Sequence, residues 1–257
     1  MELKQRFNED VASYDRWRPV YVPELFHAII NYSGLDATKK ALEFGIGTGQ
    51  ATLPILKTGC DVTAIEIGEN LAEYSKQKFR QFSNFHIENM DFQNYKTKPD
   101  TFDLFYSATA FHWLPEEVGY SKALEFLKRG GTLAVFWNHP FINRDNDPLH
   151  RAIRKIYEKY PPSNDQPPVE FSEDKCKGIV DILIKNRFTN ISSQLFYQTR
   201  RFSSKEYISL LNTYSNHRAI RAEEKLGLEQ EIFTTIEAFG GTLNVYDTID
   251  LYLAQKA

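Results

Sequence analysis

The stretch Ala41-Leu-Glu-Phe-Gly-Ile-Gly-Thr-Gly-Gln50 decides the fold of this 257-residue chain. Residues 41–44 form a short apolar run that predicts a buried strand, and residues 51–57 predict a helix. Between them, glycine stands at every second position, as Gly45, Gly47 and Gly49. Glycine has no Cβ and adopts positive φ at little cost, so this turn can bring bare backbone close to a ligand. The free N–H groups at the helix start can then face polar ligand atoms.

An acidic residue follows this stretch at the end of a second apolar run, residues 61–67. A carboxylate at that point, Glu66, is placed to accept hydrogen bonds from ribose hydroxyls, so the sequence predicts a nucleoside-cofactor site. The dinucleotide fingerprint G-x-G-x-x-G/A, counted from Gly45, requires a small residue where Gln50 stands. An NAD(P) site is therefore disfavoured. A glycine-rich turn without any ligand is the remaining alternative.

The pattern E-x-G-x-G-x-G, from Glu43 to Gly49, resembles the first motif of the class I S-adenosylmethionine (SAM) dependent methyltransferases. The resemblance implies SAM as the cofactor and S-adenosylhomocysteine as the product. In this part of the chain it assigns cofactor contacts to Glu43, Gly45, Gly47, Gly49, Glu66 and Ile67.

Strands and helices alternate through the first half of the chain. The expected strands are 41–44, 62–67, 85–88, 102–108 and 132–137, and the expected helices between them are 51–57, 69–82 and 116–128. Such alternation predicts an α/β fold with a parallel, doubly wound sheet. Right-handed crossovers then bring the glycine turn and Glu66 to the same carboxyl edge of that sheet.

After residue 140 the alternation stops. The expected elements there are helices at 149–160, 205–217 and 223–239 and strands at 191–199 and 245–253, with a capping-box spacing from Ser203 to Glu206. The family resemblance implies a Rossmann-like, seven-stranded, mostly parallel sheet with its last strand antiparallel between the fifth and sixth. It also implies that the late helices form a lid over the cofactor edge. We therefore expect an N-terminal cofactor-covering segment (1–34), a SAM-binding core (35–140), and lid helices with the last two strands (141–257).

Composition and charge argue against several classes of function. The formal net charge of −3 gives no general attraction to nucleic acid or acidic membranes. The two cysteines, Cys60 and Cys176, provide neither a disulfide framework nor a metal-ligand cluster. The polar N-terminus is unlike a signal peptide, and no apolar run approaches the length of a membrane span. We expect a cytoplasmic monomer or homodimer that binds no metal, membrane or nucleic acid.

Polar residues follow the third and fourth expected strands. Asp91 and Phe92 come first, and in the resembling family an acidic residue here bonds the adenine amino group while its neighbour's backbone contacts the ring. A turn aspartate beside a core phenylalanine is the alternative. The stretch from Ser107 to Trp113 would lie beside the methionine part of SAM, and its Ala-Phe-His-Trp sequence recurs in the small-molecule branch that includes trans-aconitate methyltransferase. His112 is the candidate general base because histidine titrates near neutral pH, with a structural hydrogen bond as the alternative.

Two further stretches resemble the same branch. Tyr14-Asp-Arg-Trp-Arg18-Pro-Val-Tyr21-Val-Pro23 is similar to its Tyr-Asp-x-x-Arg-Pro-x-Tyr-Pro segment, which implies that Tyr14 and Arg18 cover the carboxylate end of the cofactor. A forked guanidinium suits a carboxylate. The substrate-binding candidates are Trp113, which would line the pocket wall, and Tyr214, His217 and Arg218 in a polar run near the C-terminus. A solvated polar surface is the alternative for that run.

Together these patterns predict a SAM-dependent methyltransferase of a small molecule. Residues 107–110 lack the Asn/Asp-Pro-Pro-Tyr/Phe motif of nucleic-acid amino-methyltransferases, and neither cysteine follows a proline, as cytosine-C5 enzymes require. A carboxylate oxygen is the first expected acceptor because it is already ionised at neutral pH. A phenol or amine acceptor would need a base, for which His112 is the candidate. The alternatives are a SAM-binding protein without transferase activity and an NAD(P)-dependent oxidoreductase.

Overall fold

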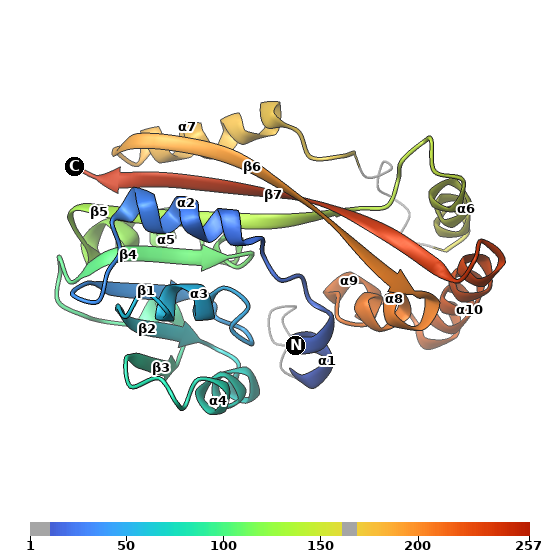
Figure 1. Ribbon diagram of the computed structural model, residues 1–257, viewed down its shortest axis with the longest axis horizontal. Helices are drawn as coiled ribbons and strands as arrows, with labels where there is room; N and C mark the ends of the chain where they lie inside the picture. Colours follow the sequence, from blue (N-terminus) through green and yellow to red (C-terminus); the bar gives the residue numbers. More distant parts are fainter. Residues whose placement is uncertain (1–10, 161–168) are drawn as a thin grey trace.

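The computed structural model describes residues 11–160 and 169–257. Its centre is a seven-stranded sheet in the order β3-β2-β1-β4-β5-β7-β6. The strands are β1 (Lys40–Phe44), β2 (Asp61–Glu66), β3 (Phe85–Asn89), β4 (Phe102–Ala108), β5 (Leu127–Phe141), β6 (Phe188–Ser203) and β7 (Thr242–Lys256). β1 to β5 pair in parallel, and β7 is antiparallel to both β5 and β6 (Figure 1). The predicted Rossmann-like sheet is confirmed, including the place of its last strand.

Helices cover both faces of the parallel half. α2 (Pro23–Ser33) and α3 (Thr52–Leu56) bury apolar side chains on one face, together with Phe79 at the end of α4 (Glu69–Lys78). α5 (Glu116–Phe126) buries its apolar side chains on the other face, and α7 (Lys177–Lys185) extends that layer over β6 and β7. Because these strands are parallel, their carboxyl ends share one edge of the sheet, which therefore gathers the loops that follow β1, β2, β3 and β4.

The three last strands of the sheet extend beyond the parallel half as a long twisted ribbon (Figure 1). Its far end carries α6 (Pro148–Tyr157), α8 (Ser204–Leu211), α9 (Ser215–Arg218) and α10 (Ala222–Ala238). These helices enclose a separate apolar cluster that includes Ile153, Phe202, Leu228, Ile232 and Leu243. We call these helices and the ribbon end the cap lobe.

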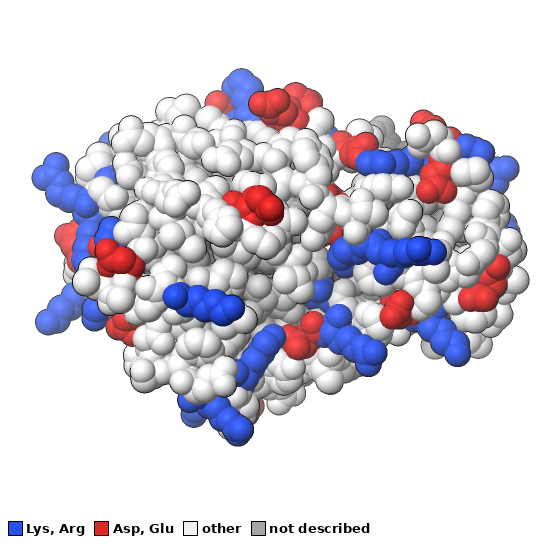
Figure 2. All heavy atoms as spheres, in the orientation of Figure 1, with Lys and Arg blue, Asp and Glu red and all other residues white. Residues whose placement is uncertain are grey.

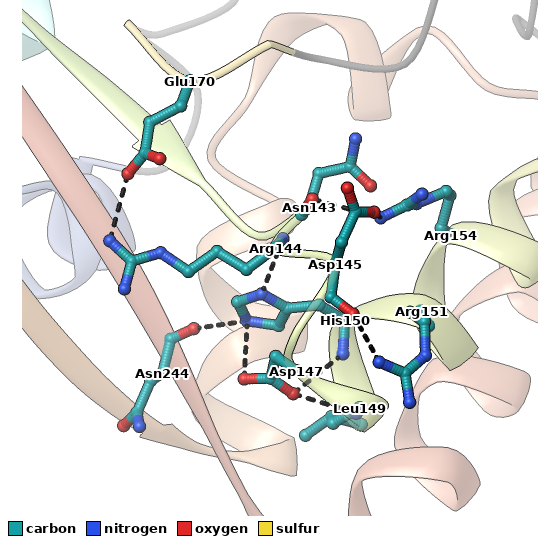
Figure 3. A network of polar contacts seen from close by, with 10 residues as sticks. All are labelled: Asn143, Arg144, Asp145, Asp147, Leu149, His150, Arg151, Arg154, Glu170 and Asn244. Atoms are coloured by element: carbon teal, nitrogen blue, oxygen red, sulfur yellow. Dashed lines mark hydrogen bonds and ion pairs between the residues drawn. The ribbon is translucent and has the colours of Figure 1, made fainter.

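A polar network fixes α6 to the ribbon (Figure 3). Asp147 begins the helix by accepting hydrogen bonds from the backbone N–H groups of Leu149 and His150. His150 is fully buried; its Nδ1 accepts from the Arg144 N–H at 3.2 Å, and its Nε2 lies 2.9 Å from the Asn244 carbonyl on β7. Because both ring nitrogens have backbone partners, the imidazole ties the exit of β5, the start of α6 and β7 together.

Several expected boundaries differ from the structure. β5 continues past the expected end at residue 137 because β7 supplies hydrogen-bonding partners as far as Phe141. The expected helix 205–217 is two helices, since Asn212 and Thr213 turn their side chains onto preceding carbonyls and end α8. The expected helix 69–82 ends at Lys78. The Ser203 capping box is confirmed. The expected segment 1–34 lies partly outside the described residues.

α1 (Val11–Trp17) packs between α4 of the core and α8 of the cap lobe. Asp15 joins it to α4 by accepting a hydrogen bond from the Tyr74 hydroxyl at 2.8 Å and pairing with Lys78 at 2.6 Å. α1 thus lies between the core and the cap lobe (Figure 1).

Candidate active site

The glycine loop between β1 and α3 takes the backbone conformation that its sequence predicted. Gly45, Gly47 and Gly49 have φ values of 69°, 58° and 78°, in the left-handed region that favours glycine. A Cβ on Gly45 would lie 2.6 Å from the Ala110 Cβ, and one on Gly49 would lie 2.3 Å from the ring of Phe79. The loop thus needs glycine both for its conformation and for close contact with its neighbours.

Gly49→Ala should therefore destabilise the protein more than an equally strained glycine replacement elsewhere. Gly130 is a matched control, because its φ is 72° and a Cβ there meets no atom within 4 Å. Gly130→Ala should lower the free energy of unfolding by about 1–2 kcal/mol, the cost of placing an alanine in the left-handed conformation. Gly49→Ala should cost about 1–3 kcal/mol more from overpacking. Urea unfolding measures both variants, and equal losses would contradict the contact with Phe79.

Glu66 ends β2 directly beside the loop. Its Oε2 accepts the Gly47 N–H and its Oε1 accepts the Gly68 N–H, both at 2.9 Å. The side chain is only 7% exposed, and this burial raises the pKa of its carboxyl group, an effect that the backbone N–H groups of Gly68, Gly47 and Ile67 partly oppose. The carboxylate is thus held by backbone at the edge of the cavity described below.

Glu43 lies beneath the loop instead of along the cavity. Its Oε2 accepts hydrogen bonds from the Thr52 hydroxyl on α3 and the Tyr106 hydroxyl on β4, both at 2.7 Å. It is completely buried, and desolvation raises the pKa of its carboxyl group to about 7. The direct cofactor contact expected for Glu43 is replaced by a supporting position between α3 and β4.

A cavity of about 300 Å³ opens at the carboxyl edge and is lined by residues of the core, the N-terminal segment and the cap lobe. The expected site residues that line it are Tyr14, Arg18, Gly45, Gly47, Glu66, Ile67, Asp91, Phe92, His112, Trp113 and Tyr214. Five others do not: Glu43, Gly49, Ser107, His217 and Arg218. The fold thus brings residues as far apart in the sequence as Tyr14 and Tyr214 to the same cavity.

The turn after β3 is built as a rigid wall. Asp91 begins the short helix η2 (Phe92–Asn94) by accepting the Gln93 N–H at 2.9 Å. Phe92 is 2% exposed and its ring lies 4.9 Å from that of Phe44. The ammonium group of Lys122 donates to three carbonyls of this turn, those of Phe92, Gln93 and Tyr95, at 2.8–3.0 Å. The sequence did not predict this role for Lys122, because a lysine on an amphipathic helix carries no sign of it.

The stretch after β4 contributes His112 and Trp113 through the short helix η3 (Phe111–Trp113). The indole Nε1 of Trp137, on β5, donates a hydrogen bond to His112 Nδ1 at 3.0 Å. Burial lowers the pKa of His112. Ser107, expected beside the cofactor, instead donates its hydroxyl to the Phe44 carbonyl at 3.0 Å and joins β4 to β1.

Arg18 joins the N-terminal segment to the cap lobe. Its guanidinium carbon lies 4.8 Å from the ring centroid of Tyr14 and 4.9 Å from that of Tyr214, so it stacks between the two rings. Its Nη2 also donates to the Thr213 carbonyl at 3.5 Å. A planar cation is thus fixed at the cap end of the cavity, far along the chain from the glycine loop.

Asn138, at the end of the core part of β5, lines the same end and was not expected. Its Nδ2 donates to Asp247 Oδ1 at 2.9 Å, and Arg200 also binds that carboxylate. Its Oδ1 is buried and has no hydrogen-bond partner among the described residues. A buried acceptor without a partner beside a cavity is suited to a ligand donor. The rule that ligands bind at the carboxyl ends of parallel strands could have indicated this residue.

His217 and Arg218 belong to the cap lobe and not to this cavity. His217 contacts Tyr157 edge-on, with Nε2 3.3 Å from the Tyr157 hydroxyl. Desolvation, with a smaller effect of Lys225, lowers the pKa of His217 to about 4. Arg218 donates its Nε to the Asn212 carbonyl at 2.9 Å. Both residues therefore support the fold of the cap lobe, which corrects their expected contact with substrate in the main cavity.

Residues 11–160 and 169–257 contain no cluster of three or more side chains suited to hold a metal ion. Over the same ranges, no helix combines the length and apolar character that crossing a membrane requires. Cys60 and Cys176 are buried free thiols.

Comparison with known proteins agrees with this geometry. Residues 41–131 match the family model described as a methyltransferase domain. An uncharacterized methyltransferase of Schizosaccharomyces pombe is 24% identical over 264 residues, which cover 99% of this chain and 96% of that one. An uncharacterized methyltransferase of a Geobacillus species is 30% identical over 162 residues, covering 62% of this chain and 73% of its own.

The fold also matches solved structures. Phosphoethanolamine N-methyltransferase 2 of Haemonchus contortus, in complex with S-adenosyl-L-methionine, is similar with a TM-score of 0.57 and 12% identity, over 100% of this chain and 60% of that one. At this identity the likeness concerns the fold, and the family follows from the sequence relatives. The chain belongs to the class I SAM-dependent methyltransferases, and its cofactor is SAM.

Proposed function

We propose that this enzyme transfers the methyl group of SAM to a carboxylate oxygen of a small molecule bound between the core and the cap lobe. The observation that carries the proposal is the composition of the cavity wall: a fixed guanidinium, Arg18, at the cap end, and a carboxylate, Glu66, at the sheet end. A cavity with opposite charges at its two ends suits a nucleoside at one end and an anion at the other.

The residues at the sheet end fit SAM. Gly45 and Gly47 offer bare backbone, and Glu66 offers a carboxylate for ribose hydroxyls. Asp91 is the candidate partner of the adenine amino group, and Phe92 and Ile67 are candidate walls for the ring. Tyr14 is the candidate cover over this ligand, because its side chain lies 3.5 Å from the position of a Cβ on Gly47.

The residues at the cap end support a small anionic acceptor. Arg18 can donate two parallel hydrogen bonds to a carboxylate. That carboxylate can be the one in the methionine part of the cofactor or the one on the acceptor. Tyr214 stacks on Arg18, and Trp113 provides further aromatic surface along the cavity. Asn138 offers a buried carbonyl oxygen, which suits a hydrogen-bond donor on either ligand and not the anionic group itself. Because the cap lobe also lines the cavity, the site can enclose a small molecule and exclude water, whereas a polymer needs an open groove.

The charge distribution supports a small molecule over a nucleic acid. On the face drawn in Figure 2, Lys and Arg side chains alternate with Asp and Glu side chains, so that face has no continuous basic strip. The formal net charge of the chain is −3. Tracking a phosphate backbone requires clustered cations.

When bound, SAM supplies an activated methyl group: the acceptor oxygen forms a bond to carbon as the S–CH₃ bond breaks, and the bonding electron pair returns to sulfur. A carboxylate loses its charge in this step and releases no proton, so the protein need not supply a base. Its residues bind the two substrates, align the acceptor oxygen with the methyl group and keep water out of the site.

The test measures binding and then turnover. We expect calorimetry to show that SAM and S-adenosylhomocysteine bind, and that NAD binds more weakly than either. Among small carboxylates, phenols and amines, we expect S-adenosylhomocysteine release with carboxylates and a product that alkaline hydrolysis returns to the acid. Binding without release for any acceptor would indicate a SAM-binding protein without transferase activity. Methylation of tRNA or DNA alone would also overturn the proposal.

A further inference from the structure

The pair formed by His112 and Trp137 determines which nitrogen of the imidazole carries the proton. An indole N–H can only donate a hydrogen bond, so His112 Nδ1, 3.0 Å from Trp137 Nε1, must be the acceptor. A neutral imidazole has one N–H group. In His112 that group is therefore Nε2–H, on a side chain that lines the cavity.

Trp137 is itself held in place. Its backbone N–H donates to Asp250 Oδ1 at 3.1 Å, and its ring meets the ring of Tyr252 edge-on at 5.9 Å. Asp250 is 2% exposed and also accepts from the Tyr252 hydroxyl at 2.8 Å, with His139 Nε2 2.9 Å away. The indole donor that faces His112 thus belongs to a packed strand residue with little freedom to turn away.

This arrangement disfavours His112 as a base that acts through Nε2. Taking a proton there would require the other tautomer, in which Nδ1–H faces the indole N–H and two donors meet with no acceptor. The hydrogen bond between Trp137 and His112 would then be lost, and such a bond contributes about 0.5–1.5 kcal/mol to stability. The ring can instead donate Nε2–H to an oxygen that already carries negative charge.

We propose that Trp137 is a positioning residue that fixes His112 as a hydrogen-bond donor to an anionic acceptor and so selects substrates that need no deprotonation. The inference rests on the proposed function and deepens it. A carboxylate has two oxygens, of which one can accept from His112 while the other attacks the methyl carbon. A neutral phenol or amine presents a proton that no nitrogen of His112 is free to take.

The surroundings of His112 keep the ring neutral. Burial lowers its pKa, and among the described residues no charged group adds to that effect. Behind Trp137, Asp250 and His139 pair with each other at 2.9 Å, and the carboxyl groups of Asp91 and Glu66 belong to the same cavity as His112. A neutral ring at pH 7 is the state in which the Trp137 hydrogen bond exists.

The test combines a spectroscopic readout with a pH profile in the full-length protein. In nitrogen-15 NMR, wild-type His112 should show a protonated Nε2 and an unprotonated Nδ1, with no need for turnover. Trp137→Phe removes the donor but keeps an aromatic ring, and should give a mixture of the two tautomers. Trp113→Phe is the control: the Trp113 ring lies 4.9 Å from the His112 ring in a tilted arrangement, so phenylalanine keeps a ring there and should leave the tautomer unchanged.

Turnover should follow the tautomer. Wild-type kcat/KM for a carboxylate should lack a limb near the ordinary histidine pKa of about 6.5. Trp137→Phe should raise the carboxylate KM several-fold and give measurable phenol methylation with a limb in that range. A protonated Nδ1 in the wild type, or a Trp137→Phe variant identical to it in both readouts, would overturn the inference. Failure to methylate any carboxylate would instead overturn the proposed function, because the NMR result does not depend on the acceptor.

Discussion

Glu66→Ala should weaken SAM binding at least tenfold and leave the sheet folded. The carboxylate lines the cavity, and each charge-assisted hydrogen bond it makes to a ribose hydroxyl would be worth about 1.5–3 kcal/mol. The same change removes the acceptor for the Gly47 and Gly68 N–H groups, so the glycine loop also loses its attachment to β2. Isothermal calorimetry with SAM gives the affinity, and circular dichroism checks the fold.

A control for this variant lies at the start of the next helix. Glu69 is exposed in the first turn of α4 and does not line the cavity, so Glu69→Ala should keep the wild-type dissociation constant. Because burial raises the pKa of Glu66, wild-type affinity should also fall as the pH is lowered, and it should do so at a higher pH than an exposed glutamate would cause. An unchanged dissociation constant in Glu66→Ala would remove Glu66 from the site.

Glu43→Gln should make the protein more stable at alkaline pH. Burial raises the pKa of Glu43 in the folded protein from its ordinary 4.5 to about 7. Between those values the unfolded chain is ionised and the folded chain is protonated, so the folded state binds more protons and stability falls as the pH rises. The difference between the pKa values of the folded and unfolded states corresponds to a loss of about 3 kcal/mol in the free energy of unfolding at alkaline pH. Glutamine cannot ionise, and its carbonyl oxygen can still accept from Thr52 and Tyr106.

The advantage of this variant should therefore depend on pH. Urea unfolding should show similar free energies for the two proteins near pH 4 to 5, and a gap that grows to about 3 kcal/mol near pH 8. Glu117→Gln, on the exposed side of α5, should change stability by less than about 0.5 kcal/mol at either pH. A Glu43→Gln protein less stable than the wild type at pH 8 would show that the ionised carboxylate is favourable where it lies.

Local sequence was sufficient for most of the parallel half of the fold. The apolar run before Gly45 and the glycine spacing fixed β1 and the loop, and β4 has the bounds that its pattern predicts. The lengths of the long strands were underestimated because their pairing partners are distant in the sequence. β5 continues through Pro140 because β7, more than a hundred residues later, pairs with it there. A partner that distant leaves no trace in the periodicity of β5 itself.

The site residues also fall into those that local sequence could predict and those that depend on distant packing. Residues that follow strands, such as Glu66, Asp91 and His112, could be predicted because topology alone brings strand ends to one edge. His217 and Arg218 could not be separated from Tyr214, since which side of a short helix meets a cavity depends on the packing of the cap lobe. The role of Trp137 depends on the 3.0 Å distance between its indole Nε1, on β5, and Nδ1 of His112, in the loop after β4. No spacing in the sequence predicts that contact.

The insertion of β7 between β5 and β6 has a consequence for biosynthesis (Figure 1). During translation β6 is made before β7, yet among the described residues β7 is the strand that pairs with it. Until residues 242–256 emerge from the ribosome, both β6 and the free edge of β5 remain exposed as open templates for other strands. Folding of the nascent chain therefore cannot reach completion vectorially, and nascent chains stalled before β7 should be clients for chaperones that cover strand edges.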